Sequence, residues 1–133
     1  MSLCLVRRES GDIVVPHLKI AATFWSRFRG LQLQKPLAAD EGLLIAPCGS
    51  VHTHWMRFAI DIVMLNGEGT VLAVRSQVRP WKLCPAPKGT RFVLETLGGT
   101  NQLTDGDDLR LSIPEGYSPP LPVAQLVQTE KIP

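Results

Sequence analysis

The segment that most constrains the fold is Asn66-Gly67-Glu68-Gly69, which separates two runs of strand-forming residues. The run before it is AIDIVML, at 59–65, and the run after it is TVLAVRSQV, at 70–78. Apolar and β-branched residues dominate both runs, and Asn-Gly is among the strongest sequence signals for a tight hairpin turn. The segment therefore predicts two antiparallel strands joined by a short turn.

Similar short apolar runs recur along the chain, and glycine, proline or aspartate separates most of them. A first hairpin is predicted around Ser10-Gly11-Asp12. The further predicted strands are LLIAPC at 43–48, SVHTHWM at 50–56, TRFVLETL at 90–97 and LRLSI at 109–113. Many short strands at near-regular spacing predict a mainly β fold, an antiparallel sandwich or a barrel-like domain.

One short helix is expected near residues 20–29. Within that stretch Ala21, Ala22, Trp25 and Phe28 recur at steps of three and four residues, which is the period of a helix face. Gly30 follows at the position of a helix C-cap.

The chain length of 133 residues fits one compact domain that buries roughly two-thirds of its unfolded surface. We expect residues 1–113 to form this β-rich domain. Residues 114–133 are rich in proline, so we expect a C-terminal tail that lies on the surface or is mobile and stays outside the core.

Composition and charge argue against several function classes. The net charge is only +2 and the basic residues are scattered, which argues against nucleic-acid binding. No apolar run approaches the roughly 20 residues of a membrane-spanning helix, and the N-terminus lacks the pattern of a secretion signal. We therefore expect a cytoplasmic protein. Cys4, Cys48 and Cys84 form no closely spaced pair, so reduced thiols are expected.

His52 and His54 are the residues most suggestive of chemistry. In a strand, residues i and i+2 face the same side, so both imidazoles can reach one divalent metal. The metal-dependent enzymes of the cupin type begin their site in this way. Their pattern also requires a carboxylate four or five residues later and a further histidine, where this chain has Phe58, Ala59 and Phe92. The alternative is that the two rings lie at the edge of the sheet, hydrogen-bonded to the protein.

Two carboxylates interrupt apolar runs and need an explanation. Asp61 lies in FAIDIVML and Glu95 lies in FVLETL. A buried carboxylate costs several kcal/mol unless it is paired or hydrogen-bonded. Asp61 therefore requires a donor, which we expect to be Arg27, Arg29, Arg57, a histidine or backbone amides. If both carboxylates shared a cavity with the histidines, acid–base chemistry would become credible.

Two functions from different classes remain open. The first is a small domain that binds a small ligand or a partner, without a cofactor, at a site comprising Arg27, His52, Thr53, His54, Met56, Asp61 and Glu95. The second is a metal-dependent enzyme on a cupin-like scaffold, with His52 and His54 as ligands. A third and weaker reading is an interaction module that uses the proline-rich tail. No catalytic residue is assigned, because no nucleophile elbow, phosphate loop or zinc-protease motif is present.

Several short motifs together resemble a known family. They are Arg27-x-x-Gly30-Leu31, Trp55-Met56 followed by Asp61, Leu94-Glu95 followed by Gly99, and Gly106-Asp107. In this order they resemble the bacterial and archaeal domain of unknown function family 192, over roughly residues 20–113. Gln32 departs from the methionine common there, and Arg57-Phe58 replaces a common Lys-Asn. The resemblance implies a mainly β, sandwich-like domain and supplies no activity, substrate or catalytic residue.

Overall fold

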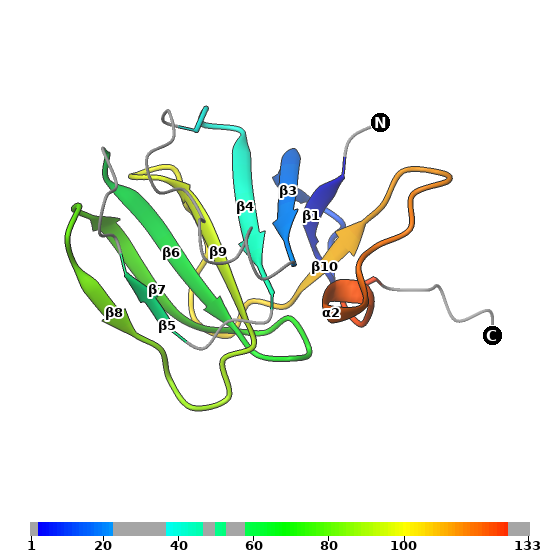
Figure 1. Cartoon of the computed structure of the whole chain (residues 1–133). Helices are drawn as coiled ribbons and strands as arrows, with labels where there is room; N and C mark the ends of the chain where they lie inside the picture. The colour runs from blue at the N-terminus through cyan, green and yellow to red at the C-terminus, as the bar shows by residue number, and fades with distance from the viewer. Residues whose placement is uncertain (1–2, 23–36, 47–49, 53–57, 128–133) are drawn as a thin grey trace.

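The computed structural model describes residues 3–22, 37–46 and 58–127 in full, and the backbone alone of residues 50–52. Its strands are β1 (Cys4–Arg7), β2 (Ile13–Val15), β3 (His17–Ala21), β4 (Glu41–Ile45), β5 (Ser50–His52), β6 (Ile60–Leu65), β7 (Val71–Val78), β8 (Leu83–Pro85), β9 (Phe92–Leu97) and β10 (Leu109–Ser112). The helix among the described residues is α2 (Leu121–Ala124) (Figure 1).

The strands form three sheets, with strand orders β10-β1-β2, β3-β4-β9-β6-β7 and β5-β8. This confirms the predicted mainly β fold. One strand pair departs from the antiparallel pattern, because β3 and β4 run parallel. Parallel neighbours need a connection of roughly a dozen residues or more, and residues 22–40 provide one.

The predicted hairpin at Asn66 to Gly69 joins β6 to β7. The Asn66 side-chain oxygen accepts hydrogen bonds from the backbone N–H groups of Glu68 at 2.9 Å and Thr70 at 3.0 Å. Gly69 has a φ of +87°, and a side chain there would clash with the backbone of Leu109. The turn therefore depends on the asparagine for its hydrogen bonds and on the glycine for its backbone conformation.

Most of the helix expected near residues 20–29 falls on residues 23–29, which lie outside the described part of the chain. Its first two residues belong to β3, where Ile20 and Ala21 pair with Leu44 and Ile45 of β4. Polar and apolar residues alternate through β3, and this period of two favours a strand over a helix there.

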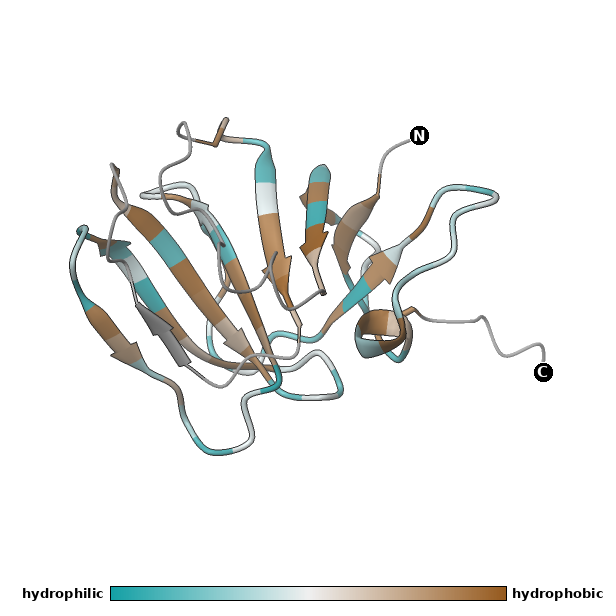
Figure 2. Ribbon diagram, in the orientation of Figure 1, coloured by the Kyte–Doolittle hydropathy of each residue, from teal (hydrophilic) through white to brown (hydrophobic). Residues whose placement is uncertain are grey.

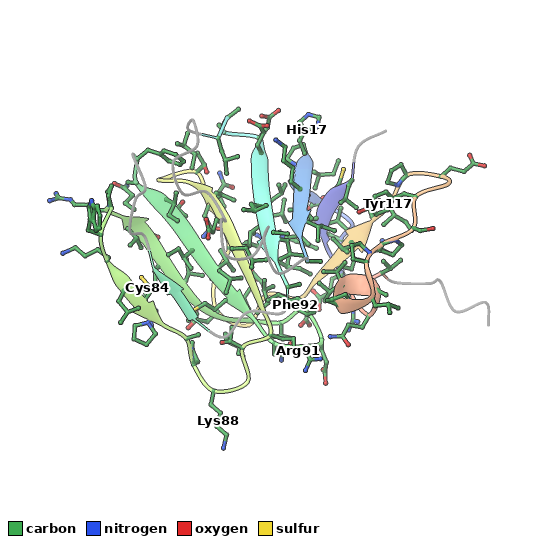
Figure 3. The ribbon with its side chains drawn as sticks, in the orientation of Figure 1. His17, Cys84, Lys88, Arg91, Phe92 and Tyr117 are labelled. Atoms are coloured by element: carbon green, nitrogen blue, oxygen red, sulfur yellow. The ribbon has the colours of Figure 1, made fainter. Side chains whose placement is uncertain are left out.

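One face of the five-stranded sheet, here called the sandwich face, packs against the three-stranded sheet. The shared core joins Leu44, Val63 and Phe92 of the larger sheet to Leu5 and Leu111 of the smaller one. In Figure 2 hydrophobic residues, coloured brown, predominate in the strands around this core. Figure 3 labels Phe92 on β9.

The C-terminal segment takes part in this core, so the prediction of a tail outside the core is wrong for residues 121–127. Val123 in α2 and Leu126 are buried in the cluster of the sandwich face. The backbone N–H of Leu111 donates to the carbonyl of Leu126 at 2.9 Å, which ties the segment to β10. Proline prevents residues 114–120 from continuing the sheet, but the apolar residues that follow still bury their side chains.

The opposite face of the five-stranded sheet, here called the ribbon face, is apolar as well. Its buried cluster includes Leu43, Ile62 and Val93 from the sheet together with Cys84 from β8. The two-stranded β5–β8 ribbon, in which His52 pairs with Leu83, therefore lies over this face. Figure 3 shows Cys84 on this ribbon.

Candidate functional site

Two buried carboxylates lie in adjacent central strands of the five-stranded sheet. Asp61 in β6 is 1% exposed and Glu95 in β9 is 4% exposed. Asp61 pairs with Thr96, whereas Glu95 pairs with Ile62. Because side chains alternate between the faces of a strand, Asp61 belongs to the sandwich face and Glu95 to the ribbon face. The two carboxylates do not share a cavity.

Backbone amides donate hydrogen bonds to the buried carboxylate of Asp61. Its carboxylate accepts hydrogen bonds from the N–H groups of Gln77 at 2.8 Å, Gly99 at 3.0 Å and Asn101 at 2.8 Å. Hydrogen bonds to an ionised acceptor are roughly twice as strong as neutral ones. Of the donors expected from the sequence, the backbone amides are confirmed.

Two of the donors of Asp61, Gln77 near the end of β7 and Gly99 in the turn after β9, have unusual backbone conformations. Gln77 has a φ of +49° and Gly99 a φ of +87°. Such left-handed conformations are strained for a side-chain-bearing residue and easy for glycine. Asp61 therefore ties the end of β7 and the segment after β9 to the sheet. This is a structural role.

The surroundings of Glu95 differ from those of Asp61. It sits between Leu43 of β4 and Ile62 of β6 in the register of the sheet. Its Oε2 atom is buried and has no hydrogen-bond partner among the described residues. Burial raises the pKa of Glu95 from 4.5 to about 7, because the anion is poorly solvated in this environment.

The β5–β8 ribbon brings two further groups toward the ribbon face. Burial raises the pKa of the Cys84 thiol, and the positive charge of Arg75 partly offsets that effect. His52 lies in β5, and its side chain is outside the described part of the structure. The other predicted site residues, Arg27, Thr53, His54 and Met56, also lie outside it, so their membership in a common site stays a prediction.

The metal site predicted from His52 and His54 likewise depends on side chains outside the described ranges. Within those ranges, no group of three or more His, Cys, Asp or Glu side chains is close enough to hold a metal ion. The proposed divalent metal thus stays a prediction.

A polar groove opens beside the sandwich face, and sequence reasoning missed it. Its volume is about 360 Å³, and its lining includes Arg7, Asp12, Glu41, Thr96, Thr100 and Gln102. These residues come from β1 and the turn after it, the start of β4, the end of β9 and the segment that follows. No local motif joins them, so only the fold brings them together.

The one basic residue named in the groove lining is held by an acid beside it. Arg7 forms an ion pair with Asp107 at 2.9 Å and donates to the carbonyl of Gln102 at 3.5 Å. The backbone N–H of Thr104 lowers the pKa of Asp107, and the hydrogen bond and charge of Arg7 act in the same direction.

The family model described as "Uncharacterized ACR", domain of unknown function family 192, matches residues 5–111. The chain belongs to this family. Two of the motifs that suggested the family meet in space, since Asp61 accepts a hydrogen bond from Gly99. The family is uncharacterised, so membership identifies no activity.

Relatives and solved structures agree with this membership. A UPF0127 protein of Thermococcus sibiricus is 29% identical over 131 residues, covering 92% of this chain and 84% of its own length. A second UPF0127 protein, from Thermococcus kodakarensis, is 25% identical over 132 residues, covering 92% of this chain and 82% of its own.

Two crystal structures share the fold at 20% identity. A protein of unknown function from Novosphingobium aromaticivorans superposes with a TM-score of 0.70, covering 81% of this chain and 82% of that one. A putative transcription regulator from Sinorhizobium meliloti superposes with a TM-score of 0.68, covering 82% of this chain and 91% of that one. At this identity the likeness concerns the fold alone. Across the described ranges no helix is both long enough and apolar enough to cross a membrane.

Proposed function

We propose that this protein is a small-molecule-binding domain, and that Glu95 is the polar anchor of its site on the ribbon face. The observation that carries the proposal is the buried Oε2 atom of Glu95, which has no partner among the described residues. An unpaired buried carboxyl group lowers stability, and such groups concentrate at functional sites.

The surroundings of Glu95 favour a particular ligand class. Leu43, Ile62 and Val93 surround the carboxyl group with apolar side chains. Burial raises the pKa of Glu95 to about 7, which favours the protonated carboxyl, and a protonated carboxyl both donates and accepts hydrogen bonds. A mostly apolar molecule with one amide, amine or hydroxyl group would form a hydrogen bond with this carboxyl group and pack against the apolar side chains around it.

The remaining predicted site residues extend this proposal. His52 lies in the ribbon that covers the same face, which supports its place at the site. Arg27, Thr53, His54 and Met56 are proposed as further members on the basis of the sequence. Asp61 is removed from the ligand-contacting set, because its carboxylate is held by amides at the opposite face.

An NMR screen of the ¹⁵N-labelled full chain tests the proposal. The library consists of aromatic fragments that each carry one amide, amine or hydroxyl group. We expect binding fragments to shift the amide signals of residues 93–97, and Glu95→Leu to weaken that binding about tenfold through loss of one hydrogen bond to the anchor.

The matched control is Glu115→Leu, which makes the same change at an exposed position. It should leave fragment binding unchanged. The proposal fails if no fragment shifts the signals of β9, or if Glu95→Leu binds the fragments as tightly as the unaltered chain.

We also propose that the protein resides in the cytoplasm. The thiol of Cys84 is free, which suits a reducing compartment. Cell fractionation followed by detection of the tagged full chain tests this, and recovery in the exported fraction would contradict it.

A further inference from the structure

The polar groove on the other side of the sheet is independent of the Glu95 site. It lies between the β1–β2 hairpin, the start of β4 and the segment that follows β9. Its volume of about 360 Å³ lies within the range of small-molecule pockets, which begins at about 300 Å³. Asp61 fixes one wall, because it holds the amides of Gly99 and Asn101.

The free charge in the groove is negative. Arg7 is paired with Asp107 and bonded to Gln102, so its positive charge is already compensated. Glu41 uses its Oε1 atom to accept from the backbone N–H of Ala38 at 2.8 Å, which leaves acceptor capacity on the carboxylate. Asp12 is exposed at the rim.

Two hydroxyl groups add hydrogen-bonding capacity to the groove. Thr96 at the floor is 5% exposed, and its Oγ1 atom has no partner among the described residues. Thr100 donates its hydroxyl hydrogen to the carbonyl of Leu97 at 2.6 Å, so its oxygen is free to accept.

Gly42 shapes the floor. A side chain at that position would come within 2.9 Å of Val15 Cγ1 and 3.4 Å of Thr96 Cγ2. Glycine therefore lets β2 approach the end of β9 closely, which brings the carboxylates of the hairpin turn and of β4 to the same opening.

We propose that this groove is a second binding site, and that it takes a small hydroxylated amine. The protonated amine pairs with the carboxylates of Asp12 and Glu41. The hydroxyl groups of the ligand donate to Thr100 and reach the floor at Thr96. A neutral polyol would lack the ionic contact, and an anion would be repelled.

Glucosamine and glucose are a suitable pair of probes, because they share a ring and most hydroxyl groups and differ in one amine. Each is titrated into the ¹⁵N-labelled full chain at low ionic strength, where ionic contacts are least screened. We expect glucosamine to shift the amide signals of residues 12–15 and 100–102, and to bind at least about tenfold more tightly than glucose.

The double variant Asp12→Asn and Glu41→Gln keeps the shape of both side chains and removes their charge. It should abolish the preference for glucosamine. The control is Asp105→Asn with Glu115→Gln, which removes two charges at exposed positions outside the groove and should retain the preference.

The proposal is overturned if glucosamine does not bind, if glucose binds as tightly, or if the shifts are confined to residues outside the groove. It is also overturned if the double variant keeps the preference for glucosamine or if the control variant loses it equally. Equal chemical shifts of the other residues in all variants show that each variant is folded, so every outcome decides the question. The Glu95 proposal is unaffected by any of them, because Glu95 faces the other side of the sheet.

Discussion

Asp61 and Glu95 are both acidic, both buried and located on neighbouring strands, yet their environments are opposite. Asp61 accepts from three backbone amides on the sandwich face. Glu95 lies among apolar side chains on the ribbon face, with an oxygen that has no partner among the described residues.

The difference shows that burial alone does not indicate what a carboxylate does. The amides around Asp61 compensate for the lost hydration, so its charge stabilises the fold. At Glu95 nothing described compensates, so the group favours its protonated form and lowers stability when ionised. A residue that lowers stability in this way requires another reason for its presence, and we infer ligand binding.

The largest expected effect is that of Asp61→Ala. The substitution leaves the partly buried N–H groups of Gln77, Gly99 and Asn101 without their acceptor. Hydrogen bonds to a charged group contribute about 1.5–3 kcal/mol each, so we expect a loss of about 3–5 kcal/mol in the free energy of unfolding. Urea unfolding at pH 7 measures the loss. Asp105→Ala, at an exposed turn position, should change the free energy of unfolding by less than about 0.5 kcal/mol. Similar losses of unfolding free energy for Asp61→Ala and Asp105→Ala would show that the amide hydrogen bonds of Asp61 do not stabilise the fold.

Glu95→Gln should change the free energy of unfolding by up to about 3 kcal/mol, and the change should depend on pH. The size follows from the rise of the Glu95 pKa from 4.5 to about 7, because each unit corresponds to about 1.36 kcal/mol. The pKa is raised on folding, so the unaltered chain has the full stability of protonated Glu95 below pH 4.5. It loses that stability as the pH rises through 7.

Glutamine does not titrate, so the variant gains stability relative to the unaltered chain between pH 4.5 and 8. Urea unfolding of both proteins at several pH values measures the difference. A difference that stays constant with pH would show that Glu95 ionises normally.

Gly99→Ala tests the turn that supplies an amide to Asp61. At a φ of +87° an alanine is strained by about 1–2 kcal/mol. The added methyl group makes only an ordinary contact with Gln77 Nε2 at 3.5 Å, so the cost comes from the backbone. Thermal unfolding measures the loss, with Gly67→Ala as the comparison, because Gly67 lacks a positive φ. An equal loss in both variants would contradict this explanation.

Thr96→Val should have the smallest effect. Thr96 pairs with Asp61 in the sheet, but its buried hydroxyl has no partner among the described residues. Replacing it with a methyl group of similar shape should leave stability unchanged or raise it by up to about 1 kcal/mol. Thr100→Val, which removes the hydrogen bond to the Leu97 carbonyl, should instead lower stability by about 1 kcal/mol. A clear loss for Thr96→Val would reveal a partner of its hydroxyl.

Local patterns predicted the strands well, because hairpins depend on neighbouring residues. The turn at Asn66 to Gly69 has its own hydrogen bonds and its own glycine, and both are visible in the sequence. The prediction failed at β3 and at the C-terminal segment. Val123 is buried because β10 and the sandwich face surround it, which no local pattern reveals.

The candidate site was predicted only in part for the same reason. The sequence indicated that Asp61 and Glu95 were both buried and that each needed an explanation. The sequence analysis placed Asp61 and Glu95 in one candidate site, because each is a single acid within an apolar run. The register between β6 and β9 separates them, since a shift of one residue moves a side chain to the other face.

The sequence by itself determined the mainly β class, the positions of the hairpin turns and the presence of two acids among apolar residues, because these depend on residues close together in the chain. The tertiary structure decided which acid receives backbone hydrogen bonds, which face each one occupies and where a groove opens. Those outcomes depend on amides and side chains that are distant in sequence and meet only when the sheets pack together.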